Sequence, residues 1–235
     1  MPEIRFDLRA RGRTAPVRVT VSAEPIRPVE LLPVLNQVND ALIGLAVQDS
    51  RVSCGAGCGA CCRQMVPIGE MEARYLAELI AAMPEERRKR VTQRFVEAVA
   101  KLRANDLLAV PSDPGERHRR GMEYFNLGLP CPFLDDERCS IYEHRPASCR
   151  EYLVTSPAAN CSAPTAENIQ MVELPAKLSQ VLYRFGDGRG EETSKWMPLP
   201  LLLEWAAEHR DNAQPTVPGP ELLRTFMNKL TKRGT

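Results

Sequence analysis

All eight cysteines of the chain fall in two separate groups, which is a pattern typical of metal ligation. The first group is the C-x3-C-x2-C-C array of residues 54–62, and the second begins about 70 residues later. Thiolates are soft ligands that select zinc, Cu(I) or iron–sulfur clusters, and four of them complete a zinc site or hold a cluster. We therefore expect metal ligation by Cys54, Cys58, Cys61, Cys62, Cys131, Cys139, Cys149 and Cys161.

The residues between the first cysteines are glycines and alanines. Glycine lets the backbone turn tightly enough to bring several thiolates together, and it frees N–H groups to bond sulfur. Cys61 and Cys62 are adjacent, and neighbouring side chains diverge in a helix or a strand. The pair is therefore predicted to serve two centres, or to combine one ligand with one supporting residue. Eight thiolates suffice for two four-thiolate sites, and the ligands of each stay unassigned.

The cysteine spacings favour an iron–sulfur cluster, such as 4Fe–4S, over zinc. Zinc sites usually pair two C-x2-C units, and only Cys58 and Cys61 have that spacing. Such a cluster is either structural or redox-active. His144 lies inside the second group, but with enough cysteines present we expect it at the surface or behind the ligands. Four arginines next to the cysteines are candidates to offset thiolate charge: Arg63, Arg138, Arg145 and Arg150.

Composition narrows the class of protein further. The chain has 235 residues, 43% hydrophobic and 26% charged, with a net charge of +1. This balance gives no global reason to bind nucleic acid or an anionic membrane. The apolar stretch Met197–Leu203 is too short to span a bilayer, and the N-terminus lacks the apolar core of a secretory signal. We expect a cytoplasmic protein with reduced thiols and no nucleic-acid or membrane partner; a protein partner stays unknown.

Hydrophobic periodicity predicts the elements that must position the cysteines. Alternation around Ile4–Leu8 and Val17–Val21, with Gly12 between them, predicts a β-hairpin. Spacings of three and four residues predict helices over 29–48, Met71–Met83 and Val91–Leu102, a short one through Met122 and Phe125, and others over 167–183, 199–209 and 220–230. The basic face of the third helix, from Arg87 to Arg94, is interpreted as solvated.

The predicted fold class is mainly α: a helical domain around a cysteine-rich metal-binding core of irregular loops, with a small N-terminal β-hairpin. Three parts are expected. Residues 1–28 form the β-ribbon, residues 29–163 form the cysteine-cluster domain, and residues 164–235 form a C-terminal helical segment packed on that domain.

The second cysteine group also contains the ordered string CPFL-x4-C-x-IY-x2-RP-x2-CR. Together with C-x3-C-x2-CC, this string resembles the YkgJ-like cysteine-cluster family, whose domain is described as chelating zinc or iron. The resemblance extends from about Cys54 to Cys161, and it maps the family's cysteines onto the first seven in this chain. Cys161 completes the set in a less distinctive context. The resemblance implies metal binding and no settled reaction.

Several functions follow from these patterns. The main hypothesis is a metal-binding protein with an iron–sulfur cluster or zinc. One alternative is an S-adenosylmethionine-dependent protein-lysine methyltransferase-like enzyme, because flagellin lysine methylases carry a similar cluster. Another is a zinc or iron chaperone without turnover. The Cys54–Cys61 spacing also matches the radical-SAM signature, but that family needs a β/α barrel, and helices without alternating buried strands follow here. Whether the protein is an enzyme stays open.

Overall fold

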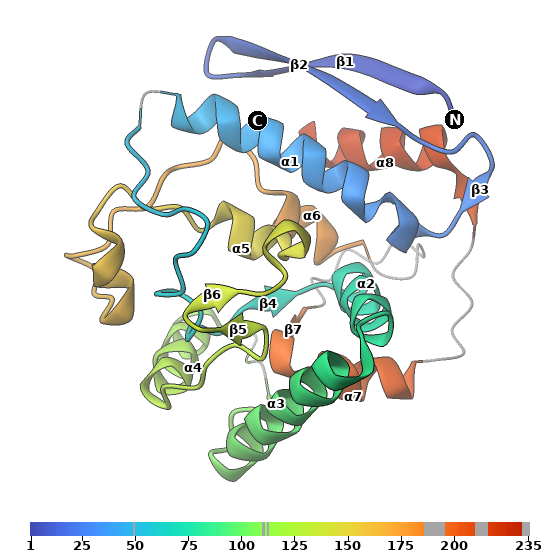
Figure 1. Cartoon of the computed structure of the whole chain (residues 1–235). Coiled ribbons are helices and arrows are strands. Elements are labelled where there is room, and N and C mark those ends of the chain that lie inside the picture. Colours follow the sequence, from blue (N-terminus) through green and yellow to red (C-terminus); the bar gives the residue numbers. More distant parts are fainter. Residues whose placement is uncertain (49, 110, 112, 186–195, 210–215, 232–235) are drawn as a thin grey trace.

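The computed structural model describes residues 1–48, 50–109, 111, 113–185, 196–209 and 216–231. Helices dominate this part of the chain, and its strands form only small two-stranded sheets (Figure 1). The cysteine-bearing segments run as irregular loops among these helices. The predicted fold class is therefore confirmed.

The N-terminal hairpin consists of β1 (Glu3–Ala10) and β2 (Arg13–Thr20). Arg11 and Gly12 connect the strands with φ angles of 51° and 75°, the positive values that a tight two-residue hairpin turn requires. The alternation places Leu8, Val17 and Val19 on a buried face. This face packs against helix α1, as Figure 1 shows at the top of the molecule.

The first hydrophobic core lies beneath this hairpin. It combines the buried stripe of η1 (Pro28–Leu31) and α1 (Leu32–Val47) with α6 (Leu178–Leu182) and α8 (Gly219–Thr231). Phe185 and Phe226 stack within it, with ring centroids 3.7 Å apart. Segments from both ends of the chain therefore share one core.

The second core joins helices to the cysteine region. It contains α2 (Glu70–Ala81), α3 (Glu85–Ala104), η4 (Leu199–Leu201) and α7 (Leu202–Glu208). Phe133 and Ile141 come from the second cysteine group and are buried in the same cluster. The Phe133 ring meets Phe95 of α3 edge-on at 5.3 Å. This packing fixes the second cysteine group to the helical scaffold.

Short elements complete the framework. Helix α4 (Pro114–Asn126) precedes the second cysteine group, which contains β5 (Leu134–Asp135), β6 (Arg138–Cys139), η2 (Tyr142–His144) and α5 (Ala147–Glu151), and η3 (Ala158–Ser162) follows. Strand β5 pairs with β6. Two further pairs join distant segments: β3 (Pro25–Ile26) with β8 (Val217–Pro218), and β4 (Pro67–Ile68) with β7 (Met197–Pro198).

One helix prediction is wrong. Residues 167–183 do not form a continuous helix, because only Leu178–Leu182 are helical. Instead, Gln170–Val172 pairs with Leu153–Ser156: the Thr155 N–H donates to the Gln170 carbonyl at 2.9 Å, and the Val172 N–H to the Leu153 carbonyl at 2.8 Å. Pro175 also lacks the N–H that a helix interior needs. This pairing of distant backbone segments is invisible to local periodicity.

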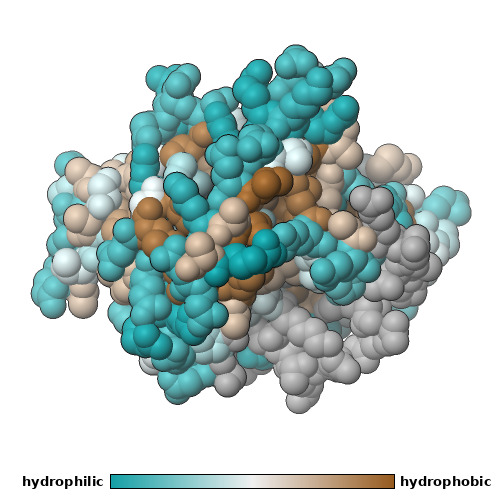
Figure 2. All heavy atoms as spheres, turned by 90° about the horizontal axis from the view of Figure 1, so that it is seen from below, coloured by the Kyte–Doolittle hydropathy of each residue, from teal (hydrophilic) through white to brown (hydrophobic). Residues whose placement is uncertain are grey.

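The face opposite the hairpin is mostly hydrophilic. Figure 2 shows this face, where apolar side chains gather near the centre and hydrophilic ones surround them. Val96 of α3 is the most exposed large hydrophobic residue within the described chain after Met1, at 58%. Among the described helices, none has both the length and the apolar character needed to cross a membrane.

Candidate metal centre

All eight predicted ligands lie in the described part of the chain, and all are free thiols. Six of them line one cavity: Cys58, Cys61, Cys62, Cys131, Cys139 and Cys149. Cys54 and Cys161 lie outside that lining. The fold thus brings both sequence groups to one place.

The first cysteine loop (residues 54–62) contains neither helix nor strand. Two backbone bonds shape it: the Cys58 N–H donates to the Gly55 carbonyl at 3.2 Å, and the Cys62 N–H to the Gly59 carbonyl at 3.0 Å. Gly59 touches the second group so closely that a Cβ there would lie 2.3 Å from the Glu137 carbonyl oxygen. Gly59 therefore permits a close approach of the two cysteine segments.

Cys161 interacts electrostatically with cysteines of the first loop. The Val154 N–H donates to the Cys54 Sγ at 3.2 Å, which ties the loop to the segment that leads toward η3. Burial raises the pKa of the Cys161 thiol, and the negative charges of Cys61, Cys54 and Cys58 raise it further. Burial likewise raises the pKa of Cys54, with contributions from Cys61 and Cys58. Because their charges act on one another, we refer to Cys54, Cys58 and Cys161 as the first trio.

The second trio consists of Cys131, Cys139 and Cys149. It lies on and beside the β5–β6 hairpin and α5. Cys131 opens this segment, with its N–H donating to the Cys62 carbonyl at 2.7 Å. Burial raises the pKa of Cys131 to about 12, and the charge of Cys139 adds to this effect. The pKa of Cys149 is raised well above its usual value by burial and by the charges of Cys131, Cys61 and Cys139.

Cys61 and Cys62 line the cavity together with Cys58 and the second trio. The neighbouring Cys62 thiol is the largest cause of the raised pKa of Cys61, and burial raises that pKa further. Residues 60–63 form a turn, so the geometry of helix and strand does not fix these side-chain directions, and their expected divergence stays a prediction. Both side chains line the same cavity. Which centre each one serves stays a prediction.

Arginines connect the cysteine segments to each other and to α3. Arg63 forms a bidentate ion pair with Glu137, with distances of 2.7 and 2.9 Å, and so joins the two segments. Arg87 donates to the Ser140 carbonyl at 2.6 Å. Arg94 donates to the Leu134 carbonyl at 2.9 Å and to Asp135 at 2.8 Å. The interpretation of the basic α3 face as merely solvated is thus wrong for Arg87 and Arg94.

A buried carboxylate anchors the segment that carries Cys149. Glu72 accepts hydrogen bonds from the Gly69 N–H at 3.0 Å and from the Ala147 N–H at 2.7 Å. It is 1% exposed, and burial raises its pKa to about 7. Ser148 also donates to the Pro67 carbonyl at 2.9 Å. These bonds fix the start of α5 to α2 and to the chain leading into it.

Of the arginines expected to offset thiolate charge, Arg145 is the one that lines the cavity. Its positive charge lowers the pKa values of Cys61 and Cys139, against the larger effects that raise them. Arg150 donates to both carboxylate oxygens of Asp40, at 2.9 and 3.0 Å from its Nη1 atom. It also donates to the Glu143 and Arg145 carbonyls. Arg63 is engaged by Glu137. His144 is exposed and bonded through Nδ1 to the Tyr75 hydroxyl at 2.7 Å.

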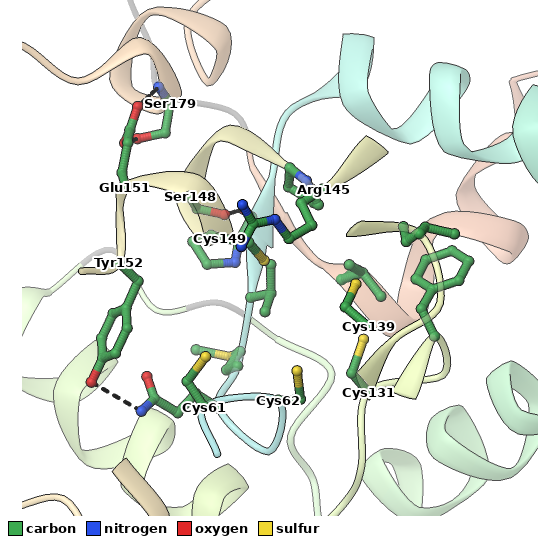
Figure 3. Close-up of a pocket in the computed structure, with 18 of the residues that line it drawn as sticks. Cys61, Cys62, Cys131, Cys139, Arg145, Ser148, Cys149, Glu151, Tyr152 and Ser179 are labelled. Carbon is green, nitrogen blue, oxygen red and sulfur yellow. Dashed lines mark hydrogen bonds between the residues drawn. The ribbon is translucent and has the colours of Figure 1, made fainter. Parts of the chain in front are cut away.

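The cavity has a volume of about 270 Å³ and extends beyond the cysteines. Figure 3 shows Cys62, Cys131 and Cys139 toward one side and Glu151, Tyr152 and Ser179 on the other. The lining also includes residues that the sequence did not single out: Gln64, Met65, Ser148, Glu151, Tyr152, Met171, Lys177, Ser179, Gln180 and Tyr183. The segment around Met171 is held beside Val154 by backbone pairing with a distant part of the chain, and local sequence patterns carry no signal of such pairing.

The donor set fits a thiolate-bound metal. The cavity offers clustered soft ligands, an apolar wall that includes Phe133, Ile141 and Leu199, and one arginine. Burial and mutual repulsion raise the pKa values of most of the thiols, so a cation is needed to hold them as thiolates at neutral pH. Within the described residues, no three His, Cys, Asp or Glu side chains converge closely enough for a single ion.

Comparison with known proteins gives one match. A family model described as "CxxCxxCC: Putative zinc- or iron-chelating domain" matches residues 53–173, just over half of the chain. The matched region includes all eight cysteines, Arg145 and the segment through Met171. No curated protein and no solved structure matches the chain.

Proposed function

The chain belongs to the CxxCxxCC family of zinc- or iron-chelating domains, and from this premise we propose that it holds an iron–sulfur cluster with a redox role. Zinc is the alternative metal. The observation that carries the proposal is the convergence of six cysteines from two distant segments on one cavity. A bound iron–sulfur cluster supplies one-electron chemistry, and the ligands would come from the cysteines named above.

The spacing of the thiols supports a cluster over a single zinc ion. Zinc–sulfur bonds of about 2.3 Å place the four sulfurs of a tetrahedral site about 3.8 Å apart. The described side chains offer no such convergence of three ligands, although the cavity holds six thiols. A cluster binds each thiolate through a different iron and therefore suits ligands that surround a larger volume.

The chain's own residues would shape the properties of this centre. Phe133, Ile141 and Leu199 line the cavity and limit the access of water to the thiolates. Arg145 balances part of the negative charge of the thiolates, which favours the more negative, reduced state of a cluster. Glu72 holds the start of α5 and thereby the position of Cys149.

The two trios suggest two centres. In this proposal, Cys54, Cys58 and Cys161 contribute to one centre, and Cys131, Cys139 and Cys149 contribute to the other. Cys61 and Cys62 complete them, one to each. Cys61 supports this arrangement because its charge acts on thiols of both trios.

The decisive experiment is the analysis of metal and acid-labile sulfide in protein purified without oxygen. Iron and sulfide in equal amounts, with the visible absorption of a cluster, are the expected result. Zinc without sulfide would refute the iron–sulfur version and leave the alternative. Protein that contains no metal and titrates as eight free thiols would refute metal ligation altogether.

Cysteine-to-serine variants test the division into two centres. Cys149→Ser and Cys54→Ser remove one member of each trio. If there are two centres, each variant loses about half of the metal, and the double variant loses nearly all of it. Complete loss of metal in each single variant would indicate one shared centre. Cys58→Ser and Cys61→Ser are also expected to lose metal.

A further inference from the structure

The guanidinium of Arg145 presents an open hydrogen-bonding fork beside the cysteines. Its Nε donates to the Tyr142 carbonyl at 3.0 Å, and its central carbon lies 3.6 Å from the centre of the Tyr142 ring. These two contacts fix the plane of the group. Within the described part of the chain, neither Nη atom has a hydrogen-bond or ion-pair partner. In Figure 3 the side chain reaches toward Ser148 and Cys149.

Apart from the thiols, the charged residues in the cavity lining are Arg145, Lys177 and Glu151. Both carboxylate oxygens of Glu151 already accept hydrogen bonds, one from the Ser179 N–H at 3.0 Å and one from the Ser179 hydroxyl at 2.5 Å. The exposed Lys177 makes no ion pair with any described residue. Lys177 acts on the charge of Glu151 without forming an ion pair with it, so the charged groups in the lining that keep open hydrogen-bonding positions are both cations.

The walls and the size of the cavity indicate the kind of molecule that fits. Tyr152, Tyr183 and Met171 supply apolar surface to the lining. The volume of about 270 Å³ lies just below the range for small-molecule pockets, about 300–1,000 Å³. A part of it adjoins the cysteines and would be taken by a metal centre. The whole cavity is too small for a molecule of nucleotide size, so an organic ligand beside the metal must be a small metabolite.

We propose that this cavity binds a small organic acid beside the cysteines, with a carboxylate held by the Arg145 fork. A planar guanidinium and a carboxylate match in two parallel hydrogen bonds, which is the strongest form of this contact. Lys177, at the start of α6, offers a second cation on the side of the cavity that carries Ser179, so a dicarboxylic acid binds better than a monocarboxylic acid of similar length. The site goes beyond metal binding, because its contacts come from residues that are not ligands.

The alternative role for Arg145 is charge balance alone. In that role the arginine needs only to lie near the thiolates, and a lysine would replace it. The fixed plane and the open Nη atoms instead match a partner with two acceptor oxygens. The two roles differ in one measurable respect, which is whether an added carboxylate binds at all.

The test is a calorimetric titration of the protein, purified with its metal, in a buffer without carboxylates. The probes are succinate, butyrate and butylamine. Succinate is expected to bind saturably, butyrate more weakly, and butylamine not at all. Absence of saturable binding by both acids would overturn the proposal, even if the metal content is as expected.

Variants locate the site. Arg145→Gln is expected to weaken the binding of both acids at least tenfold. Arg145→Lys keeps the charge but loses the paired geometry, so it is expected to retain only part of the affinity for them. Lys177→Gln is expected to weaken the binding of succinate and to leave the binding of butyrate unchanged. Arg90→Gln, which changes an exposed arginine on α3 away from the cavity, is the matched control and should bind like the unchanged protein.

Metal and sulfide are measured in every variant, so a failure of the metal centre is distinguished from a failure of this site. If Arg145→Gln loses its metal, then the affinities of Arg145→Lys and Lys177→Gln for succinate decide whether the proposed acid site exists. Binding of succinate by all three variants as in the unchanged protein would overturn the proposal. Acid binding that depends on Arg145 in a protein that contains zinc would support this site and refute the iron–sulfur version.

Discussion

The first cysteine loop (residues 54–62) and the second cysteine segment (residues 131–149) reach the same cavity by different means. The second segment is built into the scaffold: Phe133 and Ile141 are buried in the core with α2 and α3, and Cys139 and Cys149 lie in a strand and a helix. In the described residues of the first loop, no large apolar side chain is buried. Its attachments are backbone bonds, the Gly59 contact and the adjacent Arg63–Glu137 ion pair.

This difference has an energetic meaning. Burying a Phe or Ile side chain contributes about 1.5–3 kcal/mol, so the second segment holds its shape through packing. The first loop has no such contribution, and ordering each of its residues costs about 1–2 kcal/mol of backbone entropy. The fold therefore preforms one half of the proposed ligand set, and we expect metal binding to stabilise the other half.

Removal of the metal gives the sharpest test of this contrast. Chelation should increase amide hydrogen exchange in the first loop, at Cys58 and Cys62, by about 1,000-fold, because metal binding stabilises that loop most. Amides of α5 and of the β5–β6 hairpin should change little. The measurement is hydrogen exchange followed by mass spectrometry. Equal loss of protection in both segments would show that neither is preformed.

Glu72 tests how firmly the second segment is anchored. Its pKa is raised from 4.5 to about 7, so the folded state binds a proton more tightly than the unfolded chain. The resulting stabilisation is complete below pH 4.5 and is lost as pH rises through 7, a change of about 3 kcal/mol. The free energy of unfolding of the metal-free protein, measured in urea, should show this fall.

The variant Glu72→Gln should remove this pH dependence. Glu70→Gln is the control, since Glu70 lies on the same helix turn and pairs with Arg74 near the surface. A pH profile that is unchanged in Glu72→Gln would assign the dependence to another group, such as Glu151, whose pKa is also raised by burial.

Gly59 tests the contact between the two segments. In Gly59→Ala the new Cβ meets the Glu137 backbone and Leu134, so the loop must move away. We expect a loss of about 1–3 kcal/mol in unfolding free energy and a lower metal content. Gly55→Ala is the matched control in the same loop, because nothing lies within 4 Å of its Cβ. Similar behaviour of both variants would mean that the close approach is unimportant.

Breaking the Arg63–Glu137 ion pair is expected to have the smallest effect of these changes, a modest increase in the rate of metal loss. Both side chains are partly exposed, and such pairs contribute little because water and salt screen them. Glu137→Gln should speed metal loss to a competing chelator by no more than about fivefold, and less so at high salt. Asp135→Asn, which breaks the pair with Arg94 but does not join the two segments, should leave that rate unchanged.

Local patterns predicted most of the scaffold. The alternation at Ile4–Leu8 and Val17–Val21 predicted strands, and these segments form the hairpin. The spacing of three and four residues from Leu31 to Leu45 predicted a helix, and this segment forms the end of η1 and most of α1. These predictions succeeded because strand and helix periodicity depends on which face of each element is buried. The failure at 167–183 has the same cause, since Gln170–Val172 is held by a distant backbone segment and not by its own neighbours.

The sequence by itself determined the kind of chemistry. Eight clustered cysteines with no scattered ones indicate thiolate ligation, because ligand type is a property of the residues and their spacing. Only the tertiary structure decided which residues meet. It brought six of the cysteines to one cavity, left Cys54 and Cys161 outside its lining, and added Arg145 and Lys177 to its walls. Such groupings depend on contacts between residues far apart in the chain, and no local pattern encodes them.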